Sequence, residues 1–275
     1  TTTSFALMAA EILGVSVDQV RVSVNDTASA PYAGVAAGSK TTYTVGPAVI
    51  QAAQEARKQI LAIAADEFEA DPADLEIVNG MIRVRGVPSR SISLAEIAAK
   101  GMQWDSKYGP IIAHGRHADP EQAPGFCAQL AEVEVDQESG EVKVHRLVIA
   151  QDAGKAINPL AVEGQMLGGA TQGLGWALYE GIIYGEDGQV LTGSWMDYAV
   201  PAITQAAGRY ETIIVEVPTE HGPFGARGVG EPPIIPTAAA VANAIADATG
   251  ARPLDLPMTP PRVLAAINKA LSIGV

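Results

Sequence analysis

The chain contains few of the residues that build metal clusters or disulfide frameworks. It has one cysteine, Cys127, and four histidines among 275 residues. One cysteine excludes a disulfide within the chain and a cysteine cluster for zinc or iron–sulfur, and the histidines show no ligand spacing such as HExxH. Any metal is therefore expected to be held mainly by something other than protein side chains. Cys127 lies in an alternating apolar run, which favours a buried small hydrophobe over a catalytic thiol.

Basic residues and long apolar runs are also scarce. Lys and Arg total 18 against 31 Asp and Glu, so the formal net charge is −13. This balance argues against nucleic-acid binding, which needs clustered positive charge. No apolar run reaches the roughly 18 residues that cross a membrane, and the apolar segment 5–13 lacks the basic start of a signal peptide. We therefore expect a cytoplasmic protein with neither a nucleic-acid partner nor a membrane span.

Apolar periodicity predicts mixed secondary structure in the first part of the chain. Helical spacing is found in residues 5–13, 45–70 and 94–99. Gly14 follows the first of these helices as a typical C-terminal cap. Strands are expected at residues 20–24, 75–78 and 81–84, and Asn79-Gly80 between the last two is a strong hairpin signal. Residues 25–42, rich in Ala, Gly, Ser and Thr, form a long irregular loop of a kind that is often functional.

The second part opens with a hairpin and then alternates without a regular rhythm. Strands are expected at residues 130–135, 142–149, 182–184, 190–192 and 213–217. Helices are expected at residues 161–178, 236–249 and 260–271. Few apolar repeats occur in residues 101–124, so we expect two α+β subdomains, 1–115 and 116–275. The absence of a regular βαβ order favours an α+β fold over a doubly wound sheet.

The predicted helix 161–178 is unusual because it contains five glycines. They are Gly164, Gly168, Gly169, Gly173 and Gly175. Each costs roughly 1 kcal/mol against alanine inside a helix. So many glycines indicate close packing against another backbone or against a ligand.

Three segments are candidates for chemistry. In Gly225–Pro233, three glycines lead to Glu231 and two prolines follow it, so Glu231 is either a rigidly mounted general base or a solvated loop glutamate. In residues 36–42, small and hydroxyl side chains precede a helix and make either an anion cradle or an ordinary helix cap, but not a Walker A loop. Gln172, among glycines, either presents its amide to a ligand or lies in a tightly packed helix.

The order of the motifs carries more information than each motif alone. Along the chain they are Asp152-Ala153-Gly154-Lys155-Ala156-Ile157-Asn158-Pro159, Val162-Glu163-Gly164-Gln165, Gln172-Gly173-Leu174-Gly175, Gly228-Val229-Gly230-Glu231-Pro232-Pro233 and Asp255-Leu256-Pro257-Met258-Thr259-Pro260. This series resembles the xanthine oxidase (molybdenum hydroxylase) family. From Thr1 to its end, the chain is similar to the second molybdenum-cofactor-binding domain of that family.

The resemblance implies roles for particular residues. Glu231 matches the catalytic glutamate beside the molybdenum, and Gln172 matches a glutamine close to the oxo ligand of the metal. The loop that holds the phosphate end of the pterin corresponds to Ala36, Ala37, Gly38, Ser39, Lys40 and Thr41. Gly230 is the remaining candidate for cofactor binding. The implied cofactor is a molybdenum–pterin, either molybdopterin or its cytosine dinucleotide form.

The resemblance also implies a reaction. An electron-poor carbon of an N-heterocycle, a purine or an aldehyde is hydroxylated with water as the source of oxygen. Glu231 takes a proton from a hydroxyl group on molybdenum, the resulting oxygen attacks the carbon, and a hydride passes to a sulfido ligand. The pterin would hold the metal, so the chain would supply position and a base.

The resemblance further implies that the chain acts within a larger assembly. The first cofactor-binding domain of the family is absent, so the chain looks like the C-terminal half of a molybdenum subunit that is cut or separately encoded. Self-cleavage before Thr1 is one route to such an end. The expected partners are the N-terminal half, a subunit with iron–sulfur clusters and a possible FAD subunit, and the chain alone should be inactive. A scaffold subunit without molybdenum and a phosphate- or nucleotide-binding protein are the alternatives.

Overall fold

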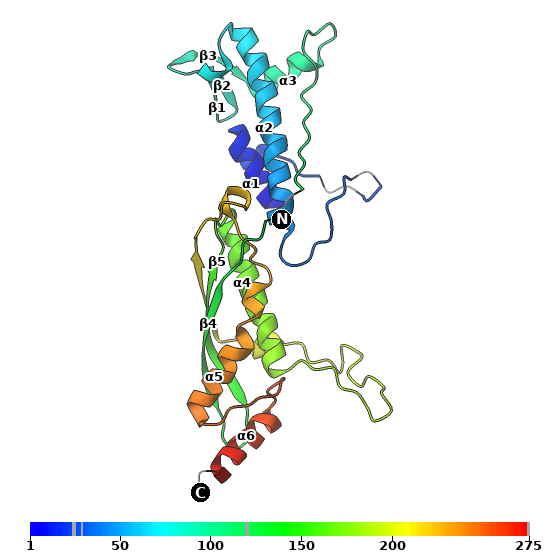
Figure 1. The fold of residues 1–275 in the computed structure, drawn as a ribbon, viewed down its shortest axis with the longest axis vertical. Coiled ribbons are helices and arrows are strands. Elements are labelled where there is room, and N and C mark those ends of the chain that lie inside the picture. Colours follow the sequence, from blue (N-terminus) through cyan, green and yellow to red (C-terminus); the bar gives the residue numbers. More distant parts are fainter. Residues whose placement is uncertain (24–25, 29, 119–120, 274–275) are drawn as a thin grey trace. The chain divides into compact units, whose positions relative to one another are not determined.

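The computed structural model describes residues 1–23, 26–28, 30–118 and 121–273. The chain forms two compact units (Figure 1). The first unit comprises Thr1–Ala123 together with Thr219–Ala226, and the second comprises Pro124–Pro218 together with Arg227–Val275. The chain therefore passes from one unit to the other three times. The expected division between residues 115 and 116 stays a prediction.

Two helices, α1 (Thr2–Leu13) and α2 (Thr41–Phe68), pack together in the first unit. The predicted helix 5–13 is confirmed, and Gly14 caps it in the left-handed conformation with φ 66°. Helix α2 begins four residues before its expected start. Gly46 of α2 permits a close approach at this end, because a Cβ there would lie 2.8 Å from Cγ of Pro223 and 3.1 Å from Cε of Met8.

The other end of α2 packs against a small antiparallel sheet. Its strands are β1 (Leu75–Val78), β2 (Met81–Val84) and β3 (Val87–Ser93), in that order. The predicted hairpin is confirmed, and both Asn79 and Gly80 adopt positive φ as its turn requires. Helix α3 (Leu94–Met102) follows, where Ser93 and Glu96 cap each other reciprocally. Buried Ile60, Ile82 and Ile97 join these elements in one core.

Two features of the first unit differ from expectation. Residues 20–23 form no strand, and residue 24, the last of that predicted strand, lies outside the described residues. Valine alternation alone does not make a strand when no neighbouring strand pairs with it, and most of these side chains are exposed. Conversely, β3 was not expected, because its Pro, Ser and Arg residues carry little strand propensity. Pairing with β2 holds it in place.

The second unit is built on a mixed sheet. Its strands are β4 (Cys127–Val135), β5 (Val142–Asp152) and β6 (Arg209–Val215). Strands β4 and β5 form the predicted antiparallel hairpin, and β6 runs parallel to β5. Strand β6 begins four residues before the expected position and ends two residues earlier.

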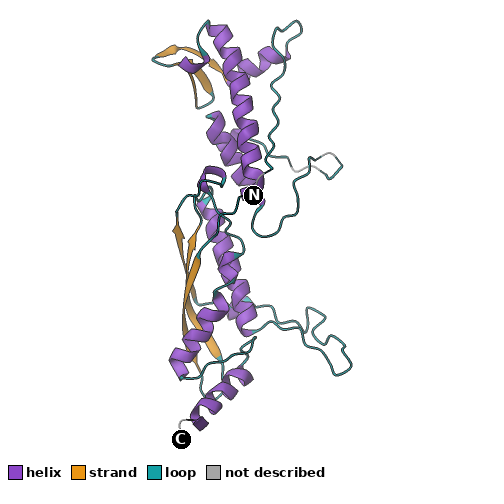
Figure 2. Cartoon of the chain, viewed as in Figure 1, coloured by secondary structure: helices purple, strands orange, loops and turns teal. Residues whose placement is uncertain are grey.

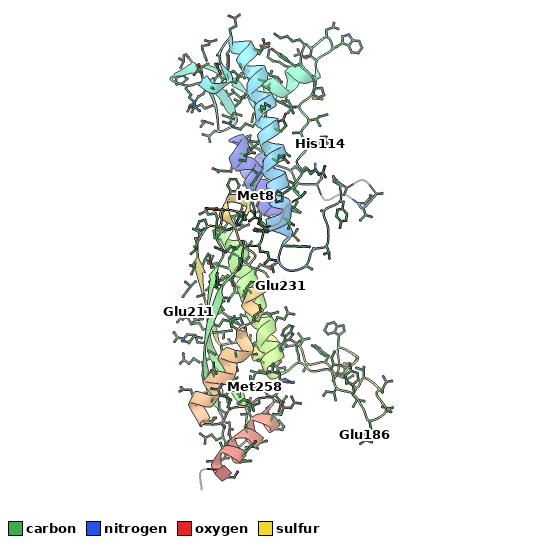
Figure 3. The ribbon with its side chains drawn as sticks, viewed as in Figure 1. Met8, His114, Glu186, Glu211, Glu231 and Met258 are labelled. Atoms are coloured by element: carbon green, nitrogen blue, oxygen red, sulfur yellow. The ribbon has the colours of Figure 1, made fainter. Side chains whose placement is uncertain are left out.

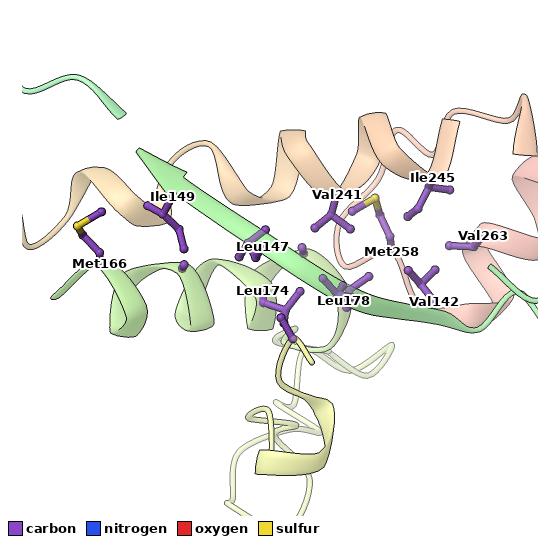
Figure 4. Packing of buried hydrophobic residues seen from close by; sticks show 14 of the residues in the cluster. Val142, Leu147, Ile149, Met166, Leu174, Leu178, Val241, Ile245, Met258 and Val263 are labelled. Carbon is purple, nitrogen blue, oxygen red and sulfur yellow. The ribbon is translucent and has the colours of Figure 1, made fainter. Parts of the chain in front are cut away.

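Three helices complete the second unit and confirm the helices predicted there. They are α4 (Pro159–Leu178), α5 (Thr237–Thr249) and α6 (Pro260–Ile273). Figure 4 shows how the core is made: Leu147 and Ile149 of β5 lie among side chains of α4 and α5, such as Leu174 and Val241. All four side chains are completely buried. The sheet and both helices are thereby held as one body, which carries Gln172 and Glu231 of the candidate site described below.

A long segment between α4 and β6 consists mostly of loops and turns, with one short 3₁₀ helix at Ile203–Gln205 (Figure 2). The predicted strands 182–184 and 190–192 are wrong, because only one isolated bridge joins Tyr184 to Val190. A two-stranded ribbon is marginal in water unless another layer covers it. Here the large side chains of Ile182, Ile183 and Leu191 remain exposed.

The α+β class is confirmed, since each unit combines helices with a three-stranded sheet of its own. Within the described residues, no helix has the length and apolar character that crossing a membrane requires.

Candidate functional site

Glu231 lies immediately before a short 3₁₀ turn, Pro232–Ile234 (Figure 3). Its side chain is exposed, whereas Pro233 behind it is buried. The two prolines occupy the first positions of the turn, and the Glu231 carbonyl oxygen accepts a hydrogen bond from the Ile234 N–H at 3.1 Å. The carboxylate is therefore mounted on a backbone with little conformational freedom.

Helix α4 packs directly against the segment that follows Glu231. A Cβ on Gly169 would lie 2.9 Å from Cβ of Pro233, and a Cβ on Gly173 would lie 2.5 Å from Oγ1 of Thr237 and 2.9 Å from the Ile234 oxygen. Real side chains do not fit at such distances, so only glycine allows this approach. The expectation of close packing against another backbone is confirmed at these two glycines.

The carbonyl oxygen of Pro233 is fixed from two directions. It accepts a hydrogen bond from Nε2 of Gln129 on β4 at 2.5 Å and another from Oγ1 of the buried Thr237 at 3.0 Å. Gln151 of β5 lies close to the same turn, with Gly125 between them. A Cβ built on Gly125 would lie 3.6 Å from Cγ of Pro232 and 3.7 Å from Nε2 of Gln151. The turn after Glu231 is thus hydrogen-bonded to β4 and lies against β5.

The segment before Glu231 is held by Arg227. Its backbone N–H donates to the Ala153 oxygen at 2.9 Å, and its Nε lies 3.2 Å from Oδ2 of Asp152. Its guanidinium also donates to the Val217 oxygen from Nε at 3.1 Å and to the Pro124 oxygen from Nη1 at 2.7 Å. Only Gly228, Val229 and the half-buried Gly230 separate this anchor from Glu231.

Gln172 lies on an exposed face of α4. Gly164 and Gly168 precede it at intervals of four residues, so the three positions lie on one stripe of the helix. A Cβ on either glycine would meet nothing within 4 Å. Since Gln172 stands between the two glycines that contact the Pro232–Thr237 segment, the fold places the helix of Gln172 beside the turn of Glu231.

The predicted anion cradle, residues 36–41, belongs to the other unit. Residues 36–40 lie outside regular structure and are largely exposed, and Gly38 and Ser39 both have positive φ, 67° and 56°. Helix α2 begins at Thr41, with Lys40 as its N-cap and no side chain hydrogen-bonded there as a cap. Its first turn contains no acidic residue. The positive end of the helix dipole therefore suits an anion.

The described ranges contain no group of three or more His, Cys, Asp or Glu side chains that could hold a metal ion. Cys127 is half-buried on β4, where it packs against the hydrophobic core. Burial raises the pKa of its thiol, which disfavours the nucleophilic thiolate.

The side chains that hold the Glu231 segment in place, Gln129 and Arg227, were not expected from the sequence. Gln129 had a detectable signal, because it is polar at a position where the alternation of β4 points inward, between Cys127 and Ala131. Arg227 is likewise the only basic residue in the glycine-rich run that leads to Glu231. Gln129 binds Pro233 and Arg227 binds Pro124, and both partners lie more than 100 residues away in the sequence. The sequence alone therefore could not show which residues these side chains contact.

Comparison with known proteins gives a consistent result. A family model described as the molybdopterin cofactor-binding domain matches residues 1–207. The chain is 33% identical over 277 residues to the 6-hydroxypseudooxynicotine dehydrogenase complex subunit gamma of Paenarthrobacter nicotinovorans, with 98% of this chain and 35% of that protein covered. It is also 33% identical over 264 residues to the xanthine dehydrogenase molybdenum-binding subunit of Escherichia coli O157:H7, with 95% and 35% covered.

Among solved structures, the reconstituted CO dehydrogenase from Oligotropha carboxidovorans matches with a TM-score of 0.89 at 30% identity, covering 100% of this chain and 34% of that one. The chain thus spans about a third of the length of the curated relatives that it matches. The predicted likeness to part of a molybdenum-binding subunit is confirmed. With the fold, the motifs and the family model in agreement, this chain belongs to the molybdopterin cofactor-binding domain family.

Proposed function

We propose that this chain is the part of a molybdenum hydroxylase that supplies the catalytic base, Glu231. The substrate would be an electron-poor carbon of an N-heterocycle, a purine or an aldehyde, with water as the source of oxygen. The observation that carries the proposal is the contact of α4 with the turn after Glu231 at Gly169 and Gly173. This contact keeps the candidate base and Gln172 on adjoining elements of one rigid body.

The residues fit a molybdenum–pterin cofactor. At residues 36–41, mostly small side chains, two left-handed residues and a helix N-terminus without an acidic residue in its first turn suit the phosphate end of the pterin. On α4, Gly164 and Gly168 leave the helix backbone open beside the amide of Gln172. These groups are hydrogen-bonding donors and open surfaces rather than metal ligands, which suits a metal that its pterin holds.

These positions suggest separate roles for the cofactor and for the residues of the chain. When bound, the cofactor would supply the redox chemistry and the activation of water. Glu231 would accept a proton at its carboxylate, and Pro232 and Pro233 would keep that carboxylate in place. Gln172 would hold the cofactor through its side-chain amide, Gly230 would let the backbone pass close to the cofactor, and residues 36–41 would bind its phosphate through backbone N–H groups.

The test of the base is Glu231→Gln in the complex assembled in its native host. We expect kcat to fall by roughly 10²-fold or more, because general base catalysis contributes about 10²–10⁴-fold. Molybdenum and pterin content should stay at the level of the unmodified complex. Glu186→Gln, on the exposed segment between α4 and β6, is the matched control and should leave turnover unchanged. Unchanged turnover in Glu231→Gln would show that another group is the base.

We also propose that the chain works with partner chains. These are the N-terminal part of the molybdenum subunit, an iron–sulfur subunit and an FAD subunit beyond it. The observation that supports partners is the exposure of two large aromatic side chains, since Trp104 and Trp195 are 94% and 87% exposed. With a single cysteine, these 275 residues could not themselves hold an iron–sulfur cluster, so the proposal places such a cluster on the electron path outside them.

Purification from the native host, with metal and pterin analysis and mass spectrometry of every co-purifying chain, tests this proposal. Molybdenum, pterin and a companion chain that carries the remaining part of the subunit are the expected result. A stable complex without molybdenum or pterin, under conditions in which related enzymes are loaded, would instead identify a scaffold subunit.

A further inference from the structure

The loop that carries Glu231 is anchored at both ends to the same hairpin. On one side, Arg227 is bound to the end of β5 through Asp152 and Ala153. On the other side, the Pro233 oxygen is bound by Gln129 of β4. Between Arg227 and Glu231 lies only Gly228-Val229-Gly230, a sequence with little stiffness of its own.

The Arg227 anchor is largely shielded from solvent and has several points of attachment. The side chains of Arg227 and Asp152 are only 13% and 10% exposed. Oδ1 of Asp152 accepts hydrogen bonds from the N–H groups of Gly154 at 2.9 Å and Val217 at 3.1 Å, which leaves Oδ2 for the guanidinium. Arg227 also donates to the carbonyl oxygens of Val217 and Pro124, so its planar fork joins three separate backbone segments.

We propose that Arg227 is a positioning residue for Glu231. This inference rests on the proposed role of Glu231 as the base and explains how the base is held in place. Three residues can span at most roughly 10 Å, so a released Arg227 would let the segment before Glu231 move over a distance of that order. A displacement of about 1 Å at a reacting group can cost about 10²-fold in rate. The contacts of Arg227 therefore restrict the movement of the glycine-containing segment that precedes Glu231.

The principal test is Arg227→Lys in the assembled complex. Lysine keeps the positive charge beside Asp152, but one ammonium group lacks the fork that also reaches Val217 and Pro124. We expect kcat to fall by about 10-fold to 100-fold with KM within about twofold of the unmodified complex, as for a misplaced reacting group. Molybdenum and pterin content should be unchanged. Arg209→Lys, at an exposed arginine that pairs with Glu211, is the matched control and should keep full turnover.

Hydrogen exchange on the isolated chain provides a readout that does not depend on activity. The N–H groups of residue 227 and Ile234 are hydrogen-bonded to Ala153 and Glu231. In Arg227→Lys, peptides covering residues 224–236 should exchange faster, while peptides from β4 and β5 keep the rates of the unmodified chain. Asp152→Asn, which keeps the side-chain shape and loses the charge, should give the same local pattern and serves if the lysine variant does not fold.

The outcomes separate this inference from the proposed function. If Glu231→Gln abolishes turnover while Arg227→Lys changes neither kcat nor exchange at residues 224–236, the positioning role is wrong and the base assignment stands. If Arg227→Lys instead loses molybdenum or pterin, Arg227 acts in assembly and the positioning role is also wrong. If Glu231→Gln is fully active, the proposed function fails, whatever the exchange data show for Arg227.

Discussion

Glu216 shows how one exposed carboxylate stabilises the turn that follows β5. Its Oε1 accepts a hydrogen bond from the Ala156 N–H at 2.8 Å and lies 3.1 Å from Nζ of Lys155. The backbone N–H of Ala156 and then the Lys155 ammonium lower the pKa of Glu216 below its usual 4.5. Because the folded pKa is the lower one, the stabilisation is present above pH 4.5 and is lost as pH falls through the folded value.

We therefore predict that Glu216→Gln lowers the melting temperature at pH 7 and makes little difference near pH 3. The carboxylate contributes its hydrogen bond and ion pair only when it is ionised in the folded chain. Thermal unfolding of both chains between pH 3 and pH 7, followed by circular dichroism, measures the effect. Glu138→Gln, at an exposed turn between β4 and β5, is a control that should track the unmodified chain. A difference that persists at pH 3 would assign the effect to packing.

At this scale, the sequence identified the motifs but not the contacts that hold them. Glu231 and Gln172 were singled out by their glycine-rich neighbourhoods, and their catalytic and binding roles, with those of Gly230 and residues 36–41, stay predictions. The bond from Gln129 to Pro233 joins residues 104 positions apart, and the bond from Arg227 to Pro124 joins residues 103 positions apart. Such pairs depend on how the sheet and the helices come together, which no local pattern encodes.

At the scale of elements, α4 has two kinds of glycine. Gly169 and Gly173 lie where another segment occupies the space of a side chain, whereas Gly164 and Gly168 face open space. The first kind is explained by packing within the chain. The second kind has no such explanation among the residues that the structure describes, and it agrees with the proposed approach of a cofactor to the helix.

We predict opposite effects for alanine at these two kinds of position. Gly173→Ala places a Cβ 2.5 Å from Oγ1 of the buried Thr237 and should destabilise the chain by about 1–3 kcal/mol, as overpacking does. Gly168→Ala adds a methyl group in open space and should stabilise the chain by up to about 1 kcal/mol through helix propensity. Urea unfolding of the isolated chain measures both free energies. Equal effects of the two changes would contradict the packing account of Gly173.

The elements that the sequence predicted well are those with their own strong signal. Helices α1, α4, α5 and α6 have apolar periodicity over at least three turns, and the hairpin of β1 and β2 has the Asn79-Gly80 turn. Residues 20–23 and 182–192 have the alternating apolar residues of strands, but in the described part of the chain no neighbouring strand pairs with them over several residues. The strands predicted there are therefore wrong. Strand β3 shows the opposite combination: its residues have low strand propensity, but it pairs with β2.

At the scale of the whole molecule, the exposed tryptophan side chains are candidates for contact with the proposed partners. Trp104 and Trp195, one in each unit, are almost completely exposed, and Trp176 on α4 is half-exposed. Large exposed aromatic side chains are typical of surfaces that another protein covers. The isolated chain should therefore show tryptophan emission at the wavelength of water-exposed indole.

We predict that this emission shifts to shorter wavelength when the chain joins its complex. Fluorescence of chains that carry Trp104→Phe or Trp195→Phe, recorded before and after assembly with the co-purified partners, assigns the shift to each residue. The shift should shrink in at least one variant. An emission that stays at the water-exposed wavelength after assembly would show that the partners bind elsewhere.

The path of the chain also limits how this protein can be divided in evolution. Residues 219–226 belong to the first unit although residues of the second unit flank them on both sides. Pro223 in that segment fills the space that Gly46 leaves open on α2. A gene break between residues 123 and 124 would leave the first fragment without Pro223 and the second with a surplus loop. Neither unit is therefore a module that recombination can move by itself, and the two are expected to be inherited together.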